Sequence, residues 1–214
     1  MIRPLLIVLA AWASLGTAAP ASAQTVLLNE SFDTEHGGTG AAQYSGFVDF
    51  IGANVDLLAP GYFGALCEAA GGSSACVDLE GGGNGSLTTK TAYTLAPGVV
   101  TMSFDLAGDQ RNRTGNSVTA SLVSIFGETL YTESFALASD ADFTHFTRSI
   151  TLAAGTSARL SFLSGGPADS MGMLLDNVVL SAGGVPPPVP EPASALLMAA
   201  GLAGMGWVAR RRRA

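Results

Sequence analysis

Alternation of apolar and polar side chains along many short segments is the feature of this sequence that most constrains its fold. In residues 100–106 (VTMSFDL) every second side chain is apolar. Such a period of two places one face of a strand against a core and the other face in water. The same alternation recurs in residues 118–122, 159–162 and 146–152, where Arg148 breaks the pattern. Further expected strands cover residues 25–32, 46–51, 75–80, 86–95, 128–137 and 172–181.

Turn-rich stretches separate these segments, as the glycine-rich run at 81–85 and the Ser-Gly-Gly-Pro run at 164–167 illustrate. The run at 81–85 is not followed by Gly-Lys-Ser/Thr or by a helical pattern, so we expect a β-turn there rather than a phosphate loop. No segment between the two termini has a sustained helical period. We therefore predict an all-β domain over residues 24–183, an antiparallel two-sheet jelly-roll-like sandwich, with an open barrel as the alternative.

The first 23 residues have the pattern of a secretory signal peptide. Arg3 supplies a short positive region, residues 5–15 form an apolar core, and residues 21–23 (Ala-Ser-Ala) form a small-x-small cleavage site. Cleavage would leave Gln24 as the new N-terminus after export by the Sec machinery. The alternative is an uncleaved membrane anchor, for which the apolar run is short.

The C-terminal segment has three successive parts. A Pro-rich, helix-breaking linker occupies residues 184–192. Residues 193–209 contain no charge and, at about 1.5 Å per residue, would form a helix about 26 Å long, near the lower limit for crossing a bilayer. Trp207 lies where an interfacial aromatic is expected. Four arginines follow at once, at Arg210, Arg211, Arg212 and Arg213. This pattern predicts a transmembrane helix with its C-terminus in the cytoplasm, rather than a hydrophobic helix in the domain core.

The sequence Pro190-Glu191-Pro192, followed by an apolar helix and the arginine cluster, resembles the PEP-CTERM sorting signal of Gram-negative bacteria. The resemblance implies recognition by the membrane peptidase exosortase. It also implies export, transient anchoring through the tail, cleavage near the PEP motif and release to the cell surface or extracellular matrix. Proteins with this signal are associated with extracellular polysaccharide and biofilm.

A second resemblance covers most of residues 25–181. The segments that carry it are residues 55–58 (VDLL), 77–79 (VDL), 102–108 (MSFDLAG) and 174–178 (LLDNV). They are similar to the jelly-roll ectodomain common among PEP-CTERM proteins, which itself is similar to galactose-binding-like modules. This resemblance supports the sandwich first, because a fold alone does not establish a function.

The charge of the exported part excludes one class of partner. Residues 24–189 contain five bases and sixteen acids, a net charge of −11. A nucleic-acid-binding domain needs a basic face, so nucleic acid is not expected as a partner. Such a domain should be repelled by anionic surfaces in the absence of bridging cations.

Cys67 and Cys76 are the only cysteines. In an exported protein such a pair predicts a disulfide, with two free thiols as the alternative. The closed loop would contribute about 2.7 kcal/mol in the chain-entropy treatment.

Glu30, Asp33 and Asp176 form the acidic set of greatest interest. The first and last strands of a jelly roll commonly run close together, so carboxylates from both could share one Ca²⁺. Similar sandwiches often hold a structural calcium here, and Glu30 and Asp176 are the two residues that match in type. The alternative is that Asp176 and Asn177 form local hydrogen bonds at a strand bend.

A sugar-binding face would combine an aromatic platform with a few polar groups. Because Trp12 and Trp207 both lie in the terminal segments, the best candidates are Tyr62 and Phe63, in a turn between glycines. The alternative is that these rings fill the end of the sandwich core. His36 and His145 lie in no catalytic motif, and we expect the protein not to be an enzyme.

These inferences predict an exported, exosortase-sorted cell-surface or extracellular-matrix protein with a structural or adhesive role in exopolysaccharide or biofilm. The alternative is a carbohydrate-binding, lectin-like module, with structural Ca²⁺ as the candidate cofactor. The expected parts are a signal peptide, a β-sandwich ectodomain, a Pro-rich linker with the PEP motif, a transmembrane helix and an Arg-rich cytoplasmic tail, at residues 1–23, 24–183, 184–192, 193–209 and 210–214.

Overall fold

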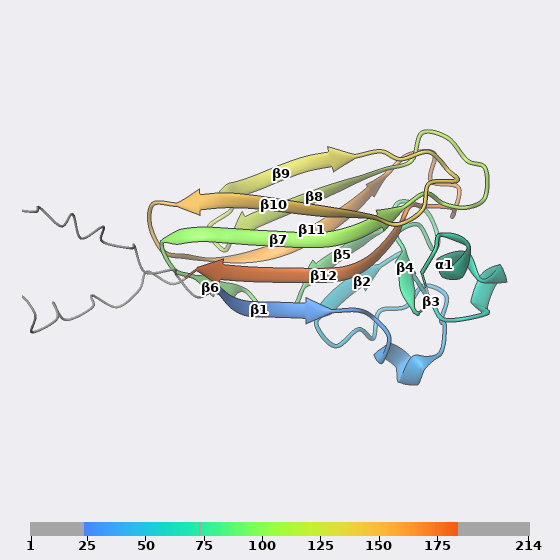
Figure 1. Ribbon diagram of the computed structural model, residues 1–214, viewed down its shortest axis with the longest axis horizontal. Coiled ribbons are helices and arrows are strands. Elements are labelled where there is room, and N and C mark those ends of the chain that lie inside the picture. The colour runs from blue at the N-terminus through green and yellow to red at the C-terminus, as the bar shows by residue number, and fades with distance from the viewer. Residues whose placement is uncertain (1–23, 73, 184–214) are drawn as a thin grey trace, which may run out of the picture.

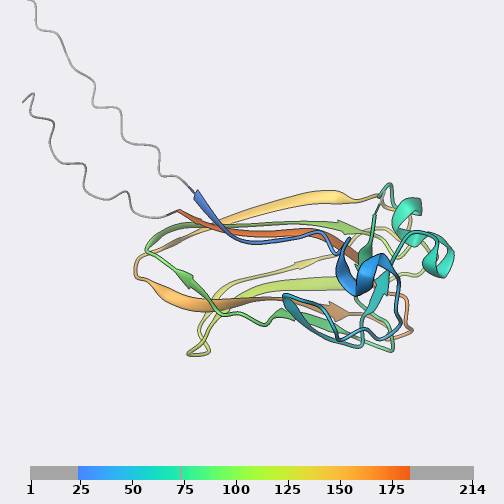
Figure 2. The ribbon, with the colours of Figure 1, turned by 90° about the horizontal axis from the view of Figure 1, so that it is seen from below.

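The computed structural model describes residues 24–72 and 74–183. The predicted signal peptide, Pro-rich linker, transmembrane helix and Arg-rich tail lie outside this part of the chain. The described residues form two six-stranded antiparallel sheets packed face to face (Figures 1 and 2). The prediction of an antiparallel two-sheet jelly-roll-like sandwich is thus confirmed. Within the two described ranges, no helix is both long and apolar enough to cross a bilayer.

The first sheet has the strand order β10-β7-β12-β4-β3, with β1 also paired to β12. The long strand β12 lies at its centre. One edge of β12 pairs with β7, while along the other edge its first residues pair with β4 and its later residues with β1. The strands of this sheet are β1 (Gln24–Glu30), β3 (Asp56–Leu58), β4 (Cys76–Asp78), β7 (Gly98–Ala107), β10 (Thr144–Leu152) and β12 (Leu174–Gly183).

The second sheet has the order β2-β5-β11-β8-β9, with β6 also paired to β11. Its strands are β2 (Phe50–Ala53), β5 (Ser86–Thr89), β6 (Tyr93–Leu95), β8 (Ser117–Ser124), β9 (Thr129–Phe135) and β11 (Thr156–Gly165). Helical structure in the described ranges is limited to three short elements: η1 (Glu35–Gly38), η2 (Tyr62–Gly64) and α1 (Leu66–Ala69).

The core lies between the two sheets, where the apolar faces of their strands meet. In β7 and β8 every second side chain is buried, as the period of two predicts. Phe104 of β7 packs edge-on against Phe162 of β11 at a centroid distance of 5.1 Å, which joins one sheet to the other. Because this core is continuous and formed by the described residues themselves, the ectodomain has what it needs to fold as a unit.

The structure differs from two of the expected strands and adds one that was not expected. The expected strand 86–95 is two strands, β5 and β6, because its pairing with β11 is interrupted after Thr89, whose hydroxyl, rather than a backbone carbonyl, accepts the N–H of Leu160 at 3.2 Å. The expected strand 46–51 begins only at Phe50, since the N–H of Val48 donates to the Glu35 carboxylate instead of to a neighbouring strand. The strand β3 was not among the expected strands.

The two ends of the sandwich differ in what they carry. At one end, which we name the tail end, β1 begins opposite the last residue of β12, with Gln24 paired to Gly183. The tail end consists of residues 24–27, 95–99, 124–130, 152–157 and 180–183. At the opposite end, the loop end, lie α1, η2 and the connections that follow β4, β7, β9 and β11 (Figure 1).

Candidate functional site

A pocket of about 310 Å³ lies at the loop end. Its lining comes from five separate parts of the chain: β3, the η2–α1 segment, the turn after β4, the β7–β8 loop and the β11–β12 loop. The lining residues are Asp56, Phe63, Leu66, Gly81, Arg111 and Ser170. An aromatic ring, a carboxylate and a guanidinium therefore meet in one hollow.

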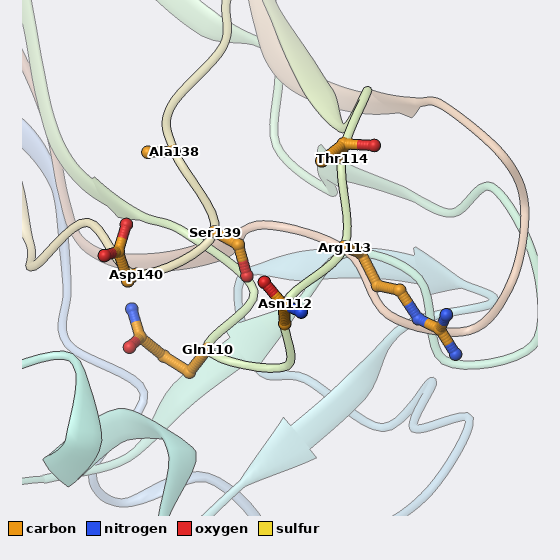
Figure 3. Close-up of a pocket in the computed structure, with 7 residues that line it drawn as sticks. All are labelled: Gln110, Asn112, Arg113, Thr114, Ala138, Ser139 and Asp140. Carbon is orange, nitrogen blue, oxygen red and sulfur yellow. The ribbon is translucent and has the colours of Figure 1, made fainter.

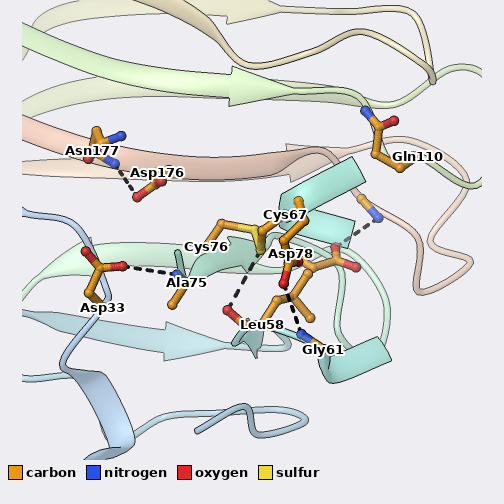
Figure 4. Close-up of a disulfide and its surroundings, with 12 residues drawn as sticks. Asp33, Leu58, Gly61, Cys67, Ala75, Cys76, Asp78, Gln110, Asp176 and Asn177 are labelled. Carbon is orange, nitrogen blue, oxygen red and sulfur yellow. Dashed lines mark hydrogen bonds between the residues drawn. A yellow bond between two sulfur atoms is a disulfide. The ribbon is translucent and has the colours of Figure 1, made fainter. Parts of the chain in front are cut away.

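The wall with Phe63 and Leu66 is held by the disulfide between Cys67 and Cys76, which confirms the predicted pairing (Figure 4). It joins α1 to β4, with the two Cα atoms 6.0 Å apart. Leu58 and Leu66 pack around it in a small buried cluster, separate from the main core. The bond thus fixes the short segment α1 to the strand β4.

Tyr62 and Phe63 have different surroundings. Tyr62 packs against the disulfide cluster, and a β-carbon at Gly40 would collide with its ring. Phe63 is 53% exposed at the pocket, with its ring centroid 4.5 Å from that of Tyr62. Its φ of 47° lies in the left-handed region, which is unfavourable for a bulky residue and is typical of functional segments. Tyr62 therefore supports the loop, and Phe63 presents its ring to solvent.

Two acidic residues face each other beneath the pocket. Asp56 of β3 is the register partner of Asp78 of β4, and both are buried. The Asp56 carboxylate accepts the N–H of Gln43 at 2.7 Å. A β-carbon at Gly81 would collide with the Asp56 carboxylate, so glycine is what leaves room for the acid at this position.

Arg111 forms an ion pair with one member of this acidic pair, Asp78. Its Nη2 donates to Oδ2 of Asp78 at 2.6 Å, and its Nε donates to the carbonyl of Asp109 at 3.1 Å. Burial raises the pKa of Asp78 to about 6, although Arg111 and the N–H of Glu80 act to lower it. The remaining nitrogen, Nη1, has only a long contact of 3.4 Å with the carbonyl of Ser170. One edge of the guanidinium is therefore directed to the pocket.

The β7–β8 loop that contains Arg111 is organised by a buried carboxylate, Asp109. One of its oxygens accepts the N–H of Arg111 at 2.7 Å and the hydroxyl of Ser139 at 2.8 Å. The other oxygen accepts the side-chain amide of Asn116 at 3.2 Å. The position of Arg111 thus depends on contacts within its own loop and on one contact with the β9–β10 loop.

A second hollow, of about 390 Å³, lies between the β7–β8 and β9–β10 loops. Figure 3 shows Gln110, Asn112, Ser139 and Asp140 gathered around it, while the guanidinium of Arg113 points away. Nε2 of Gln110 donates to the carbonyl of Ala141 at 2.8 Å, which joins the two loops. Its lining has no aromatic ring, unlike that of the Phe63 pocket.

Of the acidic set predicted to hold calcium, Glu30 lies on β1, Asp176 lies on the neighbouring strand β12, and Asp33 lies in the turn after β1. Glu30 pairs with Val178, two residues from Asp176. Glu30 makes a local contact, since it accepts the N–H of Phe32 at 2.6 Å. Asp33 accepts the N–H of the distant residue Ala75 at 3.0 Å (Figure 4). In residues 24–72 and 74–183, no three His, Cys, Asp or Glu side chains form a group that could hold a metal. Calcium at Glu30 and Asp176 stays a prediction.

Asp176 lies at an irregularity of β12. The register against β7 shifts between Asp176 and Val179, Asn177 has a φ of 50°, and its N–H donates to the Asp176 carboxylate at 2.7 Å. This is the local hydrogen bond at a strand bend that the sequence left as the alternative. Burial raises the pKa of Asp176 to about 7, and the nearby Asp33, Asp105 and Glu30 add to the effect.

Sequence reasoning identified Phe63 and the disulfide but missed Asp56 and Arg111 as residues of one pocket. A usable signal was present in the sequence. Asp56 and Asp78 each interrupt an apolar run, in residues 55–58 and 77–79. A charge within a buried strand needs a partner, and few bases are available in this acidic domain.

Three solved structures are examples of what the chain is similar to. The K3 adhesin domain of Lys-gingipain from Porphyromonas gingivalis is 19% identical, with 74% of this chain and 100% of that chain covered and a TM-score of 0.44. The C-terminal CBM6 of LamC from Zobellia galactanivorans is 12% identical, with 72% and 98% covered and a TM-score of 0.41. CBM6cm-2 of Cellvibrio mixtus lichenase 5A, in complex with cellotriose, is 10% identical, with 73% and 97% covered and a TM-score of 0.40.

No curated protein matches the chain in sequence. At the C-terminus, residues 188–213 match the PEP-CTERM protein-sorting motif. The match includes Pro190, Glu191 and Pro192 and ends at the last of the four arginines, as the resemblance predicted. The chain therefore carries a PEP-CTERM sorting signal, which marks it as an exported protein that exosortase sorts.

Proposed function

We propose that this protein is a cell-surface or extracellular-matrix component with an adhesive role in exopolysaccharide, and that it binds glycan in the Phe63 pocket. The observation that carries the proposal is the exposed ring of Phe63 beside Asp56 and Arg111. Sugar rings stack on aromatic faces, while a few polar groups fix their orientation. The volume of about 310 Å³ is at the small end of ligand clefts and suits a short glycan segment.

The charges around the pocket favour a neutral glycan. Arg111 is already paired with the buried Asp78, and Asp56 lies alongside. A carboxylate on an acidic glycan would lie near two acids and only one base, so it would be repelled. Neutral hydroxyl groups could still donate to Asp56 and accept from Nη1 of Arg111.

Binding without catalysis is the better reading of this arrangement. Asp78 is fully buried, and its oxygens are taken by Arg111 and by the backbone N–H groups of Glu80 and Gly172. Asp56 likewise accepts a backbone N–H. These carboxylates thus organise the loops of the pocket, whereas a glycosidase presents two carboxyl groups across the scissile bond.

A direct test uses purified residues 24–189 and the host's own extracellular polysaccharide, fractionated into neutral and acidic polymers. Binding is measured by co-sedimentation and by calorimetry, with Ca²⁺ and with a chelator. We expect saturable binding to the neutral fraction. Loss of binding in the chelator would support calcium at Glu30 and Asp176.

The variant Phe63→Ala should weaken binding at least about tenfold, equivalent to about 1.4 kcal/mol. Phe126→Ala is the matched control, because that ring is also exposed but lies at the tail end. Equal binding by both variants and the wild type would refute the Phe63 site. Absence of binding to any fraction would leave a passive structural role in the matrix as the remaining function.

A further inference from the structure

The tail end carries a concentration of exposed apolar side chains. Phe126 is 86% exposed and Ile125 57% exposed, and both lie in the turn that joins β8 to β9. Val26 of β1 and Val99 of β7 are exposed at the same end. Single exposed apolar residues are ordinary on a protein surface, but Ile125 and Phe126 are two large ones side by side on one turn.

The β8–β9 turn is a rigid one. The hydroxyl of Ser124 accepts the N–H groups of Phe126 and Glu128 at 3.3 and 3.1 Å. The N–H of Gly127 donates to the carbonyl of Ser124, and that of Ile125 donates to Ser157 on the adjoining strand β11, both at 2.9 Å. Gly127 takes a φ of 86°, which suits glycine. The structure therefore holds Ile125 and Phe126 outward.

A hollow of about 540 Å³ lies beside this turn. Apolar side chains of Phe126, Leu130 and Leu152 contribute to its lining, together with the backbone and small side chains of residues 153–156. Glu128 is the one charged residue of this lining. The exposed turn and the hollow form one weakly charged surface.

The charges of the domain are segregated away from this surface. Among the residues that define the tail end, all of them described, Glu128 is the only one with a charged side chain. Clusters of acids lie instead at the loop end, which contains Asp56, Asp78, Asp109 and Asp142. The net charge of −11 therefore repels anionic surfaces mainly from the loop end.

The chain itself indicates which surface the tail end faces. Gly183, the last residue of β12, is separated by only nine residues from Ala193, where the apolar part of the sorting signal begins. Nine residues span at most about 30 Å when fully extended. While the signal anchors the protein, the end that contains Gly183 must lie close to the bilayer.

We propose that the tail end docks on the external face of the bilayer that holds the sorting signal, with Ile125 and Phe126 inserted at the lipid headgroup boundary. Apolar side chains on a rigid turn gain free energy at this boundary, and the near absence of charge removes the repulsion that an acidic surface would meet. Docking would direct the loop end and its Phe63 pocket away from the membrane (Figures 1 and 2).

The test uses tryptophan fluorescence of the full chain in phospholipid vesicles. Trp12 and Trp207 are the only tryptophans, so replacing both with Phe gives a silent background. Phe126→Trp then reports on the tail end, and Phe63→Trp is the matched control at the loop end. Both variants are reconstituted in phosphatidylcholine vesicles with a minor share of phosphatidylglycerol, with and without brominated phosphatidylcholine, which quenches only a ring that contacts lipid.

We expect F126W to emit at shorter wavelength in vesicles than in detergent and to be quenched by brominated lipid, while F63W is unaffected. Ile125→Trp provides a second probe should F126W fold poorly, which its thermal unfolding would reveal. Equal quenching of F126W and F63W, or none at either position, would overturn the proposal. A blue shift of F126W without quenching would mean that another protein surface, such as a second copy, covers the turn, and this too would overturn it.

Discussion

Replacing Asp176 with Asn should stabilise the ectodomain at neutral and alkaline pH. Asp176 is only 4% exposed, and its register partner across the β7–β12 pair is another acid, Asp105. Burial, opposed by the hydrogen bond from the N–H of Asn177, raises the pKa of Asp176 to about 7. An Asn side chain has nearly the same shape, and its Oδ1 can accept the same N–H from Asn177, so the substitution removes the charge and keeps the contact.

The sign of the pH dependence follows from linkage. In the unfolded chain the carboxyl ionises near its ordinary pKa of 3.8, whereas in the folded domain it ionises near 7. Between these values the folded state binds more protons, so the stability of the wild type falls as pH rises through this window. Above the pKa of the folded state, the full free-energy cost of the buried Asp176 charge is present. Below about pH 4 this cost vanishes.

The magnitude can be worked from the same shift. A difference of about 3 pKa units corresponds to an upper limit of about 4 kcal/mol. The dielectric response of a folded protein, which is substantial even at buried sites, reduces this to about 1–2 kcal/mol. For a domain of this size, such a gain raises the melting temperature by about 3–6 °C.

The assay is thermal unfolding of residues 24–189, followed by circular dichroism at about pH 4 and about pH 8 in the presence of a chelator. D176N should melt higher than the wild type at the alkaline pH and equally at the acidic pH. Asp140→Asn, on the exposed β9–β10 loop, is the control and should show neither effect. A lower melting temperature for D176N in chelator, or a gain that persists at the acidic pH, would refute the reasoning. If D176N melts higher than the wild type in chelator but not after Ca²⁺ is added, the result would support calcium at Glu30 and Asp176.

Three further predictions concern other parts of the chain. Replacing Cys67 and Cys76 with Ser should lower the free energy of unfolding by about 2–3 kcal/mol in denaturant titration and should weaken glycan binding, because the wall of the Phe63 pocket loses its covalent link. Arg111→Leu leaves Asp78 buried without its partner, which should cost about 2–3 kcal/mol at about pH 8. That cost should shrink near pH 5, where Asp78, with a pKa of about 6, is protonated; a pH-independent loss would contradict this account. Mass spectrometry of the surface form should show that Arg210 to Arg213 are absent, whereas a surface form that retains them would indicate a permanent anchor.

Much of the fold could be predicted because its signals are local. The alternation in residues 100–106 follows from the geometry of an extended chain, in which successive side chains point to opposite faces, and β7 has this pattern over its whole length. The cysteine pair and the sorting motif are likewise readable without a fold. The errors occur where a side chain interrupts backbone pairing, as the Thr89 hydroxyl does between β5 and β6 by accepting the N–H of Leu160. Such contacts leave no periodic trace in the sequence.

The candidate site was predicted only in part. Phe63 could be identified as an aromatic residue in a glycine-bounded turn, but its neighbour Tyr62 packs inward. Which of two adjacent rings is exposed depends on the backbone conformation of the turn, and here Phe63 takes the left-handed region. Composition and spacing contain no information about that choice.

The sequence by itself determined most of the strands of this protein, its disulfide and its sorting signal, because each depends on residues close together in the chain or on their chemical type alone. The tertiary structure decided which charges meet: Arg111 pairs with Asp78, 33 residues away, and Asp78 lies opposite Asp56. It also decided that the exposed apolar turn lies at the end where β12 finishes. Strand order and register are set by hydrogen bonds and side-chain packing between distant segments, and these interactions exist only once the two sheets have formed.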